Sequence, residues 1–155
     1  MNKIMIISKN IGTFIGPYIY VIVIENFLYI GETQKLPIIR WGQHFSRGGS
    51  LSEKLKKQER NPFIENNPKI VCISCFCDRI FREVKDSDQL RMTQYLEDCL
   101  HNKTIARLDL FKKRFSLVSD TRCTAPRSYD CKYYWKNEYC ESVFLNVVNR
   151  VNESL

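Results

Sequence analysis

The sequence predicts an α+β fold in which helices pack around one small antiparallel sheet. Residues 18–24 alternate and are rich in β-branched side chains, and a second apolar run at 27–30 follows the polar pair Glu25-Asn26. This pattern is typical of a β-hairpin. Residues 70–76 form a near-continuous apolar run, which indicates a central buried strand. Helical patterns give the overall order hairpin, helix, helix, strand, helix, tail helix.

The first helix is expected directly after the hairpin. Pro37 suits a first helical turn, and a helix over 37–45 places Arg40 and His44 four residues apart on one face. Gly42 lies inside this helix and costs up to about 1 kcal/mol against Ala. The helix therefore needs support from tertiary packing.

Capping patterns and helical periodicity predict three more helices. Residues 50–53 (Ser-Leu-Ser-Glu) have the form of a capping box that opens a Lys-rich helix ending near Arg60. Residues 86–89 give a second capping signal, for a helix that runs to about His101. Its expected buried side chains are Met92, Tyr95, Leu96 and Cys99. After the irregular stretch 121–138, a final amphipathic helix is indicated by Phe144, Val147, Val148 and Val151.

Charge and cysteine content narrow the class of protein. The 155 residues carry a net charge of +7, and residues 1–60 hold nine Lys or Arg against four Asp or Glu. A basic balance favours a polyanionic partner, with nucleic acid first. No apolar run approaches the roughly 18–20 residues of a membrane helix, and no secretory signal is evident. The seven cysteines are then expected to be reduced thiols in a cytoplasmic protein.

The hairpin geometry brings three tyrosines together. If Glu25-Asn26 is a two-residue turn, Tyr20 lies opposite Gly31, and Tyr18, Tyr20 and Tyr29 stand on one face. Gly31 would leave an open spot where a backbone or a phosphate could approach closely. Packing of the tyrosines as ordinary strand formers is the structural alternative.

These residue types suit the hydrolysis of a phosphodiester. Tyrosine can orient or deprotonate a water, Arg40 can bind a phosphate in a fork, and His44 can move a proton near neutral pH. A carboxylate is still needed to hold a metal ion.

Two tyrosine motifs followed by Arg and His resemble the GIY-YIG nuclease family. The matching residues are Gly16-Pro17-Tyr18, Tyr29-Ile30-Gly31, Thr33, Leu36, Arg40 and His44. The resemblance covers about residues 16–120. It implies a nuclease domain over 1–120 with a three-stranded antiparallel sheet flanked by helices, and a C-terminal extension over 121–155.

The resemblance also implies a metal-dependent endonuclease that hydrolyses DNA phosphodiester bonds. Tyr18 or Tyr20 would act as general base towards the attacking water, with Tyr29 assisting. Arg40 would bind the phosphate, and His44 would shuttle a proton or bind phosphate. Glu97, which follows Arg91 on the expected helix, would hold one divalent cation, Mg²⁺ or Mn²⁺. A catalytically inactive DNA-binding or scaffold module of the same fold is the alternative.

Three departures from the family pattern matter. Pro17 stands where the family usually has an aliphatic residue, and the match to the first tyrosine is shared between Tyr18 and Tyr20. Arg40 comes one residue late, a shift that a helix starting at Pro37 could absorb. Many members of the family have an asparagine that ends the core some distance after the Glu, and residues 115–120 give no convincing match to it. By its helical position alone, Asp98 lies about as far from the apolar stripe as Glu97.

The cysteines and one basic aromatic stretch have two interpretations each. Cys72, Cys75 and Cys77 lie on an expected buried strand, where Cys72 and Cys75 point to opposite faces and a structural role is favoured over zinc. Zinc binding by Cys123, Cys131 and Cys140 lacks an evident fourth ligand. Residues 132–136 (Lys-Tyr-Tyr-Trp-Lys) suit either contact with DNA or packing of the tail.

Overall fold

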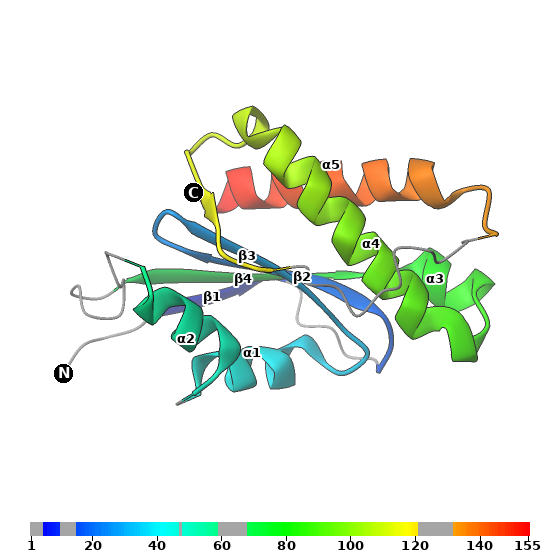
Figure 1. Cartoon of the computed structure of the whole chain (residues 1–155), viewed down its shortest axis with the longest axis horizontal. Helices are drawn as coiled ribbons and strands as arrows, with labels where there is room; N and C mark the ends of the chain where they lie inside the picture. The colour runs from blue at the N-terminus through cyan, green and yellow to red at the C-terminus, as the bar shows by residue number, and fades with distance from the viewer. Residues whose placement is uncertain (1–4, 10–14, 47, 59–67, 121–131) are drawn as a thin grey trace.

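A five-stranded mixed sheet lies between two layers of helices in the computed structural model (Figure 1). Helices α1 and α2 cover the lower face in this view, and α4 and α5 cover the upper face. The structure describes residues 5–9, 15–46, 48–58, 68–120 and 132–155.

The sheet has the strand order β1-β4-β2-β3-β5. Its strands are β1 (Met5–Lys9), β2 (Tyr18–Ile24), β3 (Phe27–Thr33), β4 (Lys69–Phe76) and β5 (Ser116–Leu117). The α+β class is confirmed, and β3, β2 and β4 form the expected antiparallel core. The expected sheet of three antiparallel strands was nevertheless incomplete, because β1 joins β4 and β5 joins β3, both in parallel.

The hairpin has the predicted register. Ile24 pairs with Phe27, and Tyr20 pairs with Gly31. Glu25 takes a positive φ of 49° in the turn, a conformation that two-residue hairpin turns require. Every residue of β2 is buried, because β3 and β4 flank this strand and helices cover both of its faces.

The helices on the lower face are α1 (Pro37–Phe45) and α2 (Ser50–Lys56). The predicted start of α1 at Pro37 is confirmed, and buried Trp41 and His44 tie the helix to the sheet despite Gly42. The capping box at the start of α2 was wrong. Gly49 is the N-cap and no side chain caps the helix, because the hydroxyl of Ser50 bonds to His44 instead. The expected end near Arg60 lies outside the described residues.

The helices beyond β4 are α3 (Asp78–Glu83), α4 (Asp86–Ala106) and α5 (Lys136–Ser154), with a short 3-10 turn at Leu108–Leu110. The sequence did not predict α3. Helix α4 is longer than expected and its N-cap is Lys85, without a side-chain cap. Met92 and Leu96 are buried as predicted, while Tyr95 and Cys99 are partly buried against the same core.

Helix α5 belongs to the main hydrophobic core. Its four predicted apolar positions are buried: Phe144, Val147, Val148 and Val151. They share one cluster with apolar residues of β2, β3, β4 and α4. A boundary at residue 121 lies outside the described residues, so the division into domain and extension stays a prediction.

Candidate active site

The candidate site lies at β3, where α1, α2 and α4 meet the sheet. The phenol of Tyr20 crosses Gly31 so closely that a Cβ at residue 31 would collide with its hydroxyl. The open spot expected opposite Tyr20 is therefore filled by Tyr20 itself, and the prediction of free space for a phosphate there was wrong. Gly31 is needed because it lets this ring lie flat on the strand.

His44 is the centre of a buried polar network. Its Nε2 lies 2.6 Å from the hydroxyl of Tyr20, and its Nδ1 lies 2.9 Å from the hydroxyl of Ser50. Burial, and then the positive charges of Arg40 and Lys54, lower the pKa of His44 to about 4. The imidazole is therefore neutral near pH 7 and can accept one proton.

Tyr29 completes this network from the neighbouring strand. Its ring centroid lies 6.2 Å from that of Tyr20 and 4.6 Å from that of His44. Burial raises the pKa of Tyr29, against the effect of its hydrogen bond with Ser50. Burial likewise raises the pKa of Tyr20 above its usual range. Both phenols are therefore protonated at neutral pH in the free protein.

Tyr18 has a different aromatic neighbour from these groups. It is buried, and its ring centroid lies 5.1 Å from that of Phe76 at the end of β4. The phenol of Tyr20, by contrast, interacts with Tyr29, Arg40 and Glu97 as well as with His44. Between the two tyrosines that the sequence left open, the structure places Tyr20 in the polar network.

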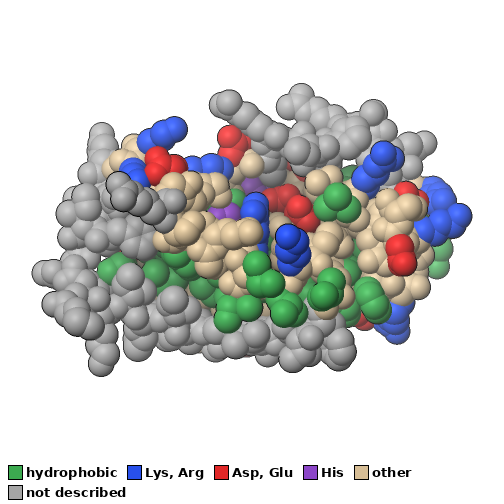
Figure 2. Space-filling view, turned by 90° about the horizontal axis from the view of Figure 1, so that it is seen from below, with side chains coloured by type: hydrophobic (Ala, Val, Ile, Leu, Met, Phe, Trp, Pro, Cys, Tyr) green, Lys and Arg blue, Asp and Glu red, His purple; other side chains and the backbone are tan. Residues whose placement is uncertain are grey.

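Arg40 lies at the mouth of the site. It lines an open hollow of about 380 Å³, together with Glu32, Thr33, Gln34, Lys35, Gln43 and Leu90. Its Nη1 donates a hydrogen bond of 3.0 Å to Oε1 of Gln43. Although burial acts against it, the phenol of Tyr20 and then that of Tyr29 raise the pKa of Arg40. Figure 2 shows acidic, basic and histidine side chains close together on this face of the molecule.

Glu97 reaches the same site from α4. Burial, and then the negative charge of Glu32, raise the pKa of Glu97 to about 8. The negative charge of Glu97 also contributes to the raised pKa values of Tyr20 and Tyr29. Asp98 instead accepts a hydrogen bond of 3.3 Å from Asn102. The negative charge of Glu97 thus acts on both phenols, whereas Asp98 is not among the main charges that act on either phenol.

A second carboxylate, that of Glu32, lies near enough to Glu97 for its charge to raise the pKa of Glu97. Oε2 of Glu32 is buried and has no hydrogen-bond partner among the described residues, so an acceptor oxygen is left for a ligand. No group of three or more His, Cys, Asp or Glu side chains that could hold a metal occurs within the described ranges. A pair of carboxylates nevertheless suits Mg²⁺, which usually binds one or two carboxylates and keeps several waters.

Three residues of the site were missed by the sequence analysis. Ser50 was assigned to a helix cap, and Lys54, whose Nζ lies 5.6 Å from the ring centroid of Tyr29, was one of several lysines in a charged helix. Glu32 had a usable signal, because it is a charged residue inside an apolar strand, directly after Tyr29-Ile30-Gly31.

Cys72 and Cys75 lie on β4 as predicted, whereas Cys77 lies just beyond the strand, at the N-cap of α3. Cys72 belongs to the lower core and Cys75 packs on the upper one, so the two point to opposite faces. Cys140 is buried in α5, whereas Cys123 and Cys131 lie outside the described residues. In the basic aromatic stretch, Trp135 packs into the core while Tyr134 is exposed.

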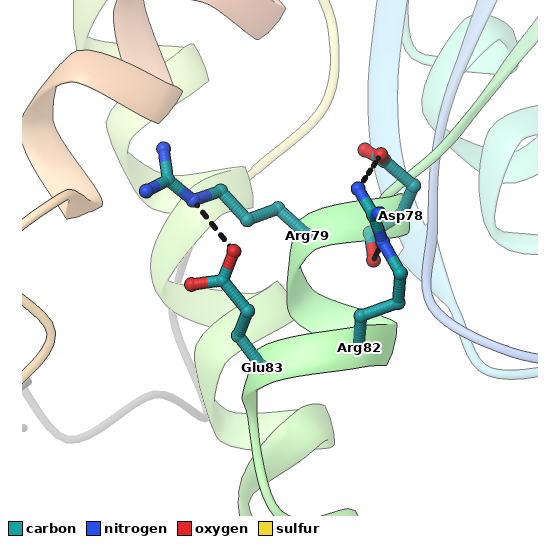
Figure 3. Close-up of polar contacts among 4 residues, drawn as sticks. All are labelled: Asp78, Arg79, Arg82 and Glu83. Atoms are coloured by element: carbon teal, nitrogen blue, oxygen red, sulfur yellow. Dashed lines mark hydrogen bonds and ion pairs between the residues drawn. The ribbon is translucent and has the colours of Figure 1, made fainter.

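The charged side chains of α3 form ion pairs with one another within the helix and are not part of the candidate site. Arg79 pairs with Glu83 at 3.2 Å, and Arg82 pairs with Asp78 at 2.8 Å (Figure 3). Both pairs span four residues of one helix, the spacing at which side chains meet on a helical surface. Arg82 is therefore an ordinary surface arginine against which Arg40 can be compared.

Comparisons of the chain with protein-family models, with curated proteins and with solved structures give no match. Among the described residues, no helix is both long enough and apolar enough to cross a membrane.

Proposed function

We propose that this protein is a metal-dependent endonuclease that hydrolyses DNA phosphodiester bonds. One observation carries the proposal. Residues far apart in the sequence, Tyr20, Tyr29, Arg40, His44 and Glu97, interact at one site. These are the residues that resemble the functional positions of GIY-YIG nucleases.

Activation of the attacking water is assigned to Tyr20 and His44. With the Tyr20 hydroxyl donating to Nε2 of His44, the Nδ1–H of His44 donates to Ser50. As the phenol takes a proton from the water, its own proton passes to Nε2. Tyr29, packed against both rings, holds them in place. The resulting hydroxide attacks phosphorus, and the ester oxygen leaves.

Phosphate binding is assigned to Arg40, which is exposed at the mouth of the hollow. Its guanidinium can bind two phosphate oxygens and stabilise the charge that develops on them. Arg40 and Lys54 also lower the pKa of His44 in the free protein, after burial. A bound phosphate would offset their charges, so substrate binding itself would make His44 a better base.

Glu97 would hold Mg²⁺ or Mn²⁺. The cation, when bound, would supply Lewis-acid stabilisation of the phosphate and of the leaving oxygen. It would also favour the charged form of Glu97, whose pKa of about 8 leaves it largely protonated in the free protein at neutral pH.

DNA as the partner fits the charge of the chain. The net charge of +7 favours a polyanion. Tyr134 is exposed, and the Nζ of Lys132 lies 5.8 Å from the ring centroid of Tyr133. Such a mixture of cations and rings can contact nucleotides outside the site.

Digestion of supercoiled plasmid tests the proposal. Purified protein is incubated with plasmid in Mg²⁺, in Mn²⁺ and in EDTA, and binding is followed by gel shift. Nicking or linearisation in either metal, and none in EDTA, is the expected result. A gel shift without cutting under any condition would contradict the proposal and favour the inactive DNA-binding module.

A further inference from the structure

We propose that Glu32 is a second carboxylate ligand of the divalent cation, so that Glu32 and Glu97 form a two-carboxylate site that binds the cation before DNA is bound. The inference rests on the proposed metal-dependent cleavage. It concerns a residue to which neither the motifs nor the resemblance gives a role.

The position of Glu32 on β3 brings it to the α4 side of the sheet. Glu32 pairs with Ile19, and Ile19 packs in the upper core with Met92 and Leu96 of α4. Because opposed residues share a face, the carboxylate of Glu32 stands on the face that α4 covers. Glu97 follows Leu96 on that helix and feels the negative charge of Glu32.

Among the described residues, no strand pairs with the outer edge of β3 beside Glu32. Strand β5 pairs only with Phe27 and Leu28, at the other end of β3. Glu32 lines the same hollow as Arg40. A hydrated cation can therefore reach the carboxylate from the side on which the phosphate would bind.

The bonding of Glu32 leaves an acceptor unused. Its Oε2 is buried and lacks a hydrogen-bond partner among the described residues. A buried carboxylate oxygen without a partner, beside a second carboxylate, is unfavourable unless a proton or a cation joins the two groups. Arg40 lies nearby, but its guanidinium also interacts with Tyr20 and Gln43.

Two carboxylates should bind the cation differently from one. A lone carboxylate gives a weak site that depends on DNA phosphates, whereas a pair supplies two charges that favour binding by the free protein. The cation would then bind first and the DNA second. The phosphate would enter a site whose acidic charge is already neutralised.

Mn²⁺ binding to the DNA-free protein tests the inference. Titration followed by electron paramagnetic resonance is run on the parent chain, Glu32→Gln, Glu97→Gln and Asp98→Asn. We expect one bound Mn²⁺ per parent chain, a loss of affinity of about tenfold or more in each Glu variant, and a change within about threefold in Asp98→Asn. Gln keeps the shape of Glu and removes charge repulsion, so both Glu variants should fold.

Thermal unfolding gives a second readout without activity. A cation that binds only the folded state raises the melting temperature, and this rise should be absent in Glu32→Gln. Affinity for Mn²⁺ equal to that of the parent in Glu32→Gln, or no Mn²⁺ binding by the DNA-free parent, would overturn the inference. Neither result depends on cleavage. A parent chain that binds Mn²⁺ through Glu32 but cuts no DNA would support the inference and contradict the proposed function instead.

Discussion

The two faces of the sheet carry different kinds of side chain. The upper face, under α4 and α5, is one large cluster of aliphatic and aromatic residues. The lower face, under α1 and α2, has a smaller cluster that includes Tyr20, Tyr29 and Trp41 and is crossed by the hydrogen bonds of His44. Apolar burial of this extent stabilises folds, whereas a buried polar network fixes geometry at a cost in desolvation. The difference indicates that stability comes mainly from the upper face, and it places most residues of the proposed active site on the lower one.

Glu97 and Glu32 are the exceptions that join the two faces. Glu97 comes from α4 on the upper side, yet its negative charge raises the pKa of both phenols. Glu32 stands on the same face and acts on Arg40 of α1. We therefore expect two kinds of substitution. One kind removes activity from a protein that stays folded, and the other destabilises the fold without changing a residue of the site.

Arg40→Ala should give the largest effect, a loss of cleavage on the order of 10³-fold with the fold unchanged. Arg40 is exposed, so its removal opens no cavity, but the phosphate loses its main cationic partner. Rates of plasmid nicking and circular dichroism are the measurements. Arg82→Ala, which removes an arginine paired with Asp78 on α3, is the matched control. Cleavage by Arg40→Ala near the parental rate would remove Arg40 from the site.

Phe144→Ala should act in the opposite way. Phe144 is fully buried in the upper core, and truncation of a buried Phe costs about 3–5 kcal/mol of stability. Urea unfolding measures this loss. Below the temperature at which the variant melts, the folded fraction should cut DNA at the parental rate. A variant that stays folded but inactive would show that the faces are not separable.

The three tyrosines should respond differently to Phe. We expect losses on the order of 10²-fold for Tyr20→Phe and about tenfold for Tyr29→Phe, with Tyr18→Phe within about threefold of the parent. The hydroxyl of Tyr20 lies 2.6 Å from Nε2 of His44, while Tyr18 packs against Phe76. Single-turnover cleavage across pH is the measurement. The parental rate should climb with pH, and this climb should flatten in Tyr20→Phe. Parental rates in all three variants would mean that the tyrosines only pack the sheet.

A smaller effect is expected on stability through Glu97. The folded protein keeps a proton on Glu97 up to about pH 8, whereas the carboxyl ordinarily titrates at 4.5. Because the folded state binds more protons on Glu97 between these values, the contribution of Glu97 to the stability of the metal-free protein should fall as pH rises from 4.5 to 8, by on the order of 2 kcal/mol. His44, whose pKa is lowered to about 4, acts in the opposite sense below pH 6.5, so the measured quantity is the difference in free energy of unfolding between the parent and Glu97→Gln, from urea unfolding in EDTA across pH. Parallel curves for the two proteins would contradict it.

The hairpin and its neighbours could be predicted from the sequence because their signals are local. A two-residue turn fixes the pairing of Tyr20 with Gly31, and a period of 2 fixes the faces. Pro37 marks the start of α1 for the same reason. Strands β1 and β5 escaped prediction because each pairs in parallel with a distant strand, and β5 is only two residues long. Parallel partners are not joined by a tight turn, so no local signal links either strand to its neighbour in the sheet.

Within the site, the sequence identified residue types better than contacts. It left Tyr18 and Tyr20 unresolved, because both lie on the same strand face and differ only in what covers them. Ser50 matched a cap pattern, although His44 takes its hydroxyl. These assignments depend on tertiary packing, because the helix that covers the strand decides which side chains meet.

The central claim, that DNA is cut at a site that depends on the Glu97 carboxylate, is tested most directly with Glu97→Gln. Cleavage of a labelled DNA duplex in Mg²⁺ and binding of the same duplex in EDTA are measured for this variant and for the parent chain. We expect binding within about threefold of the parent and cleavage slower on the order of 10³-fold. Equal cleavage rates for Glu97→Gln and the parent, or an inactive Asp98→Asn beside an active Glu97→Gln, would contradict the account.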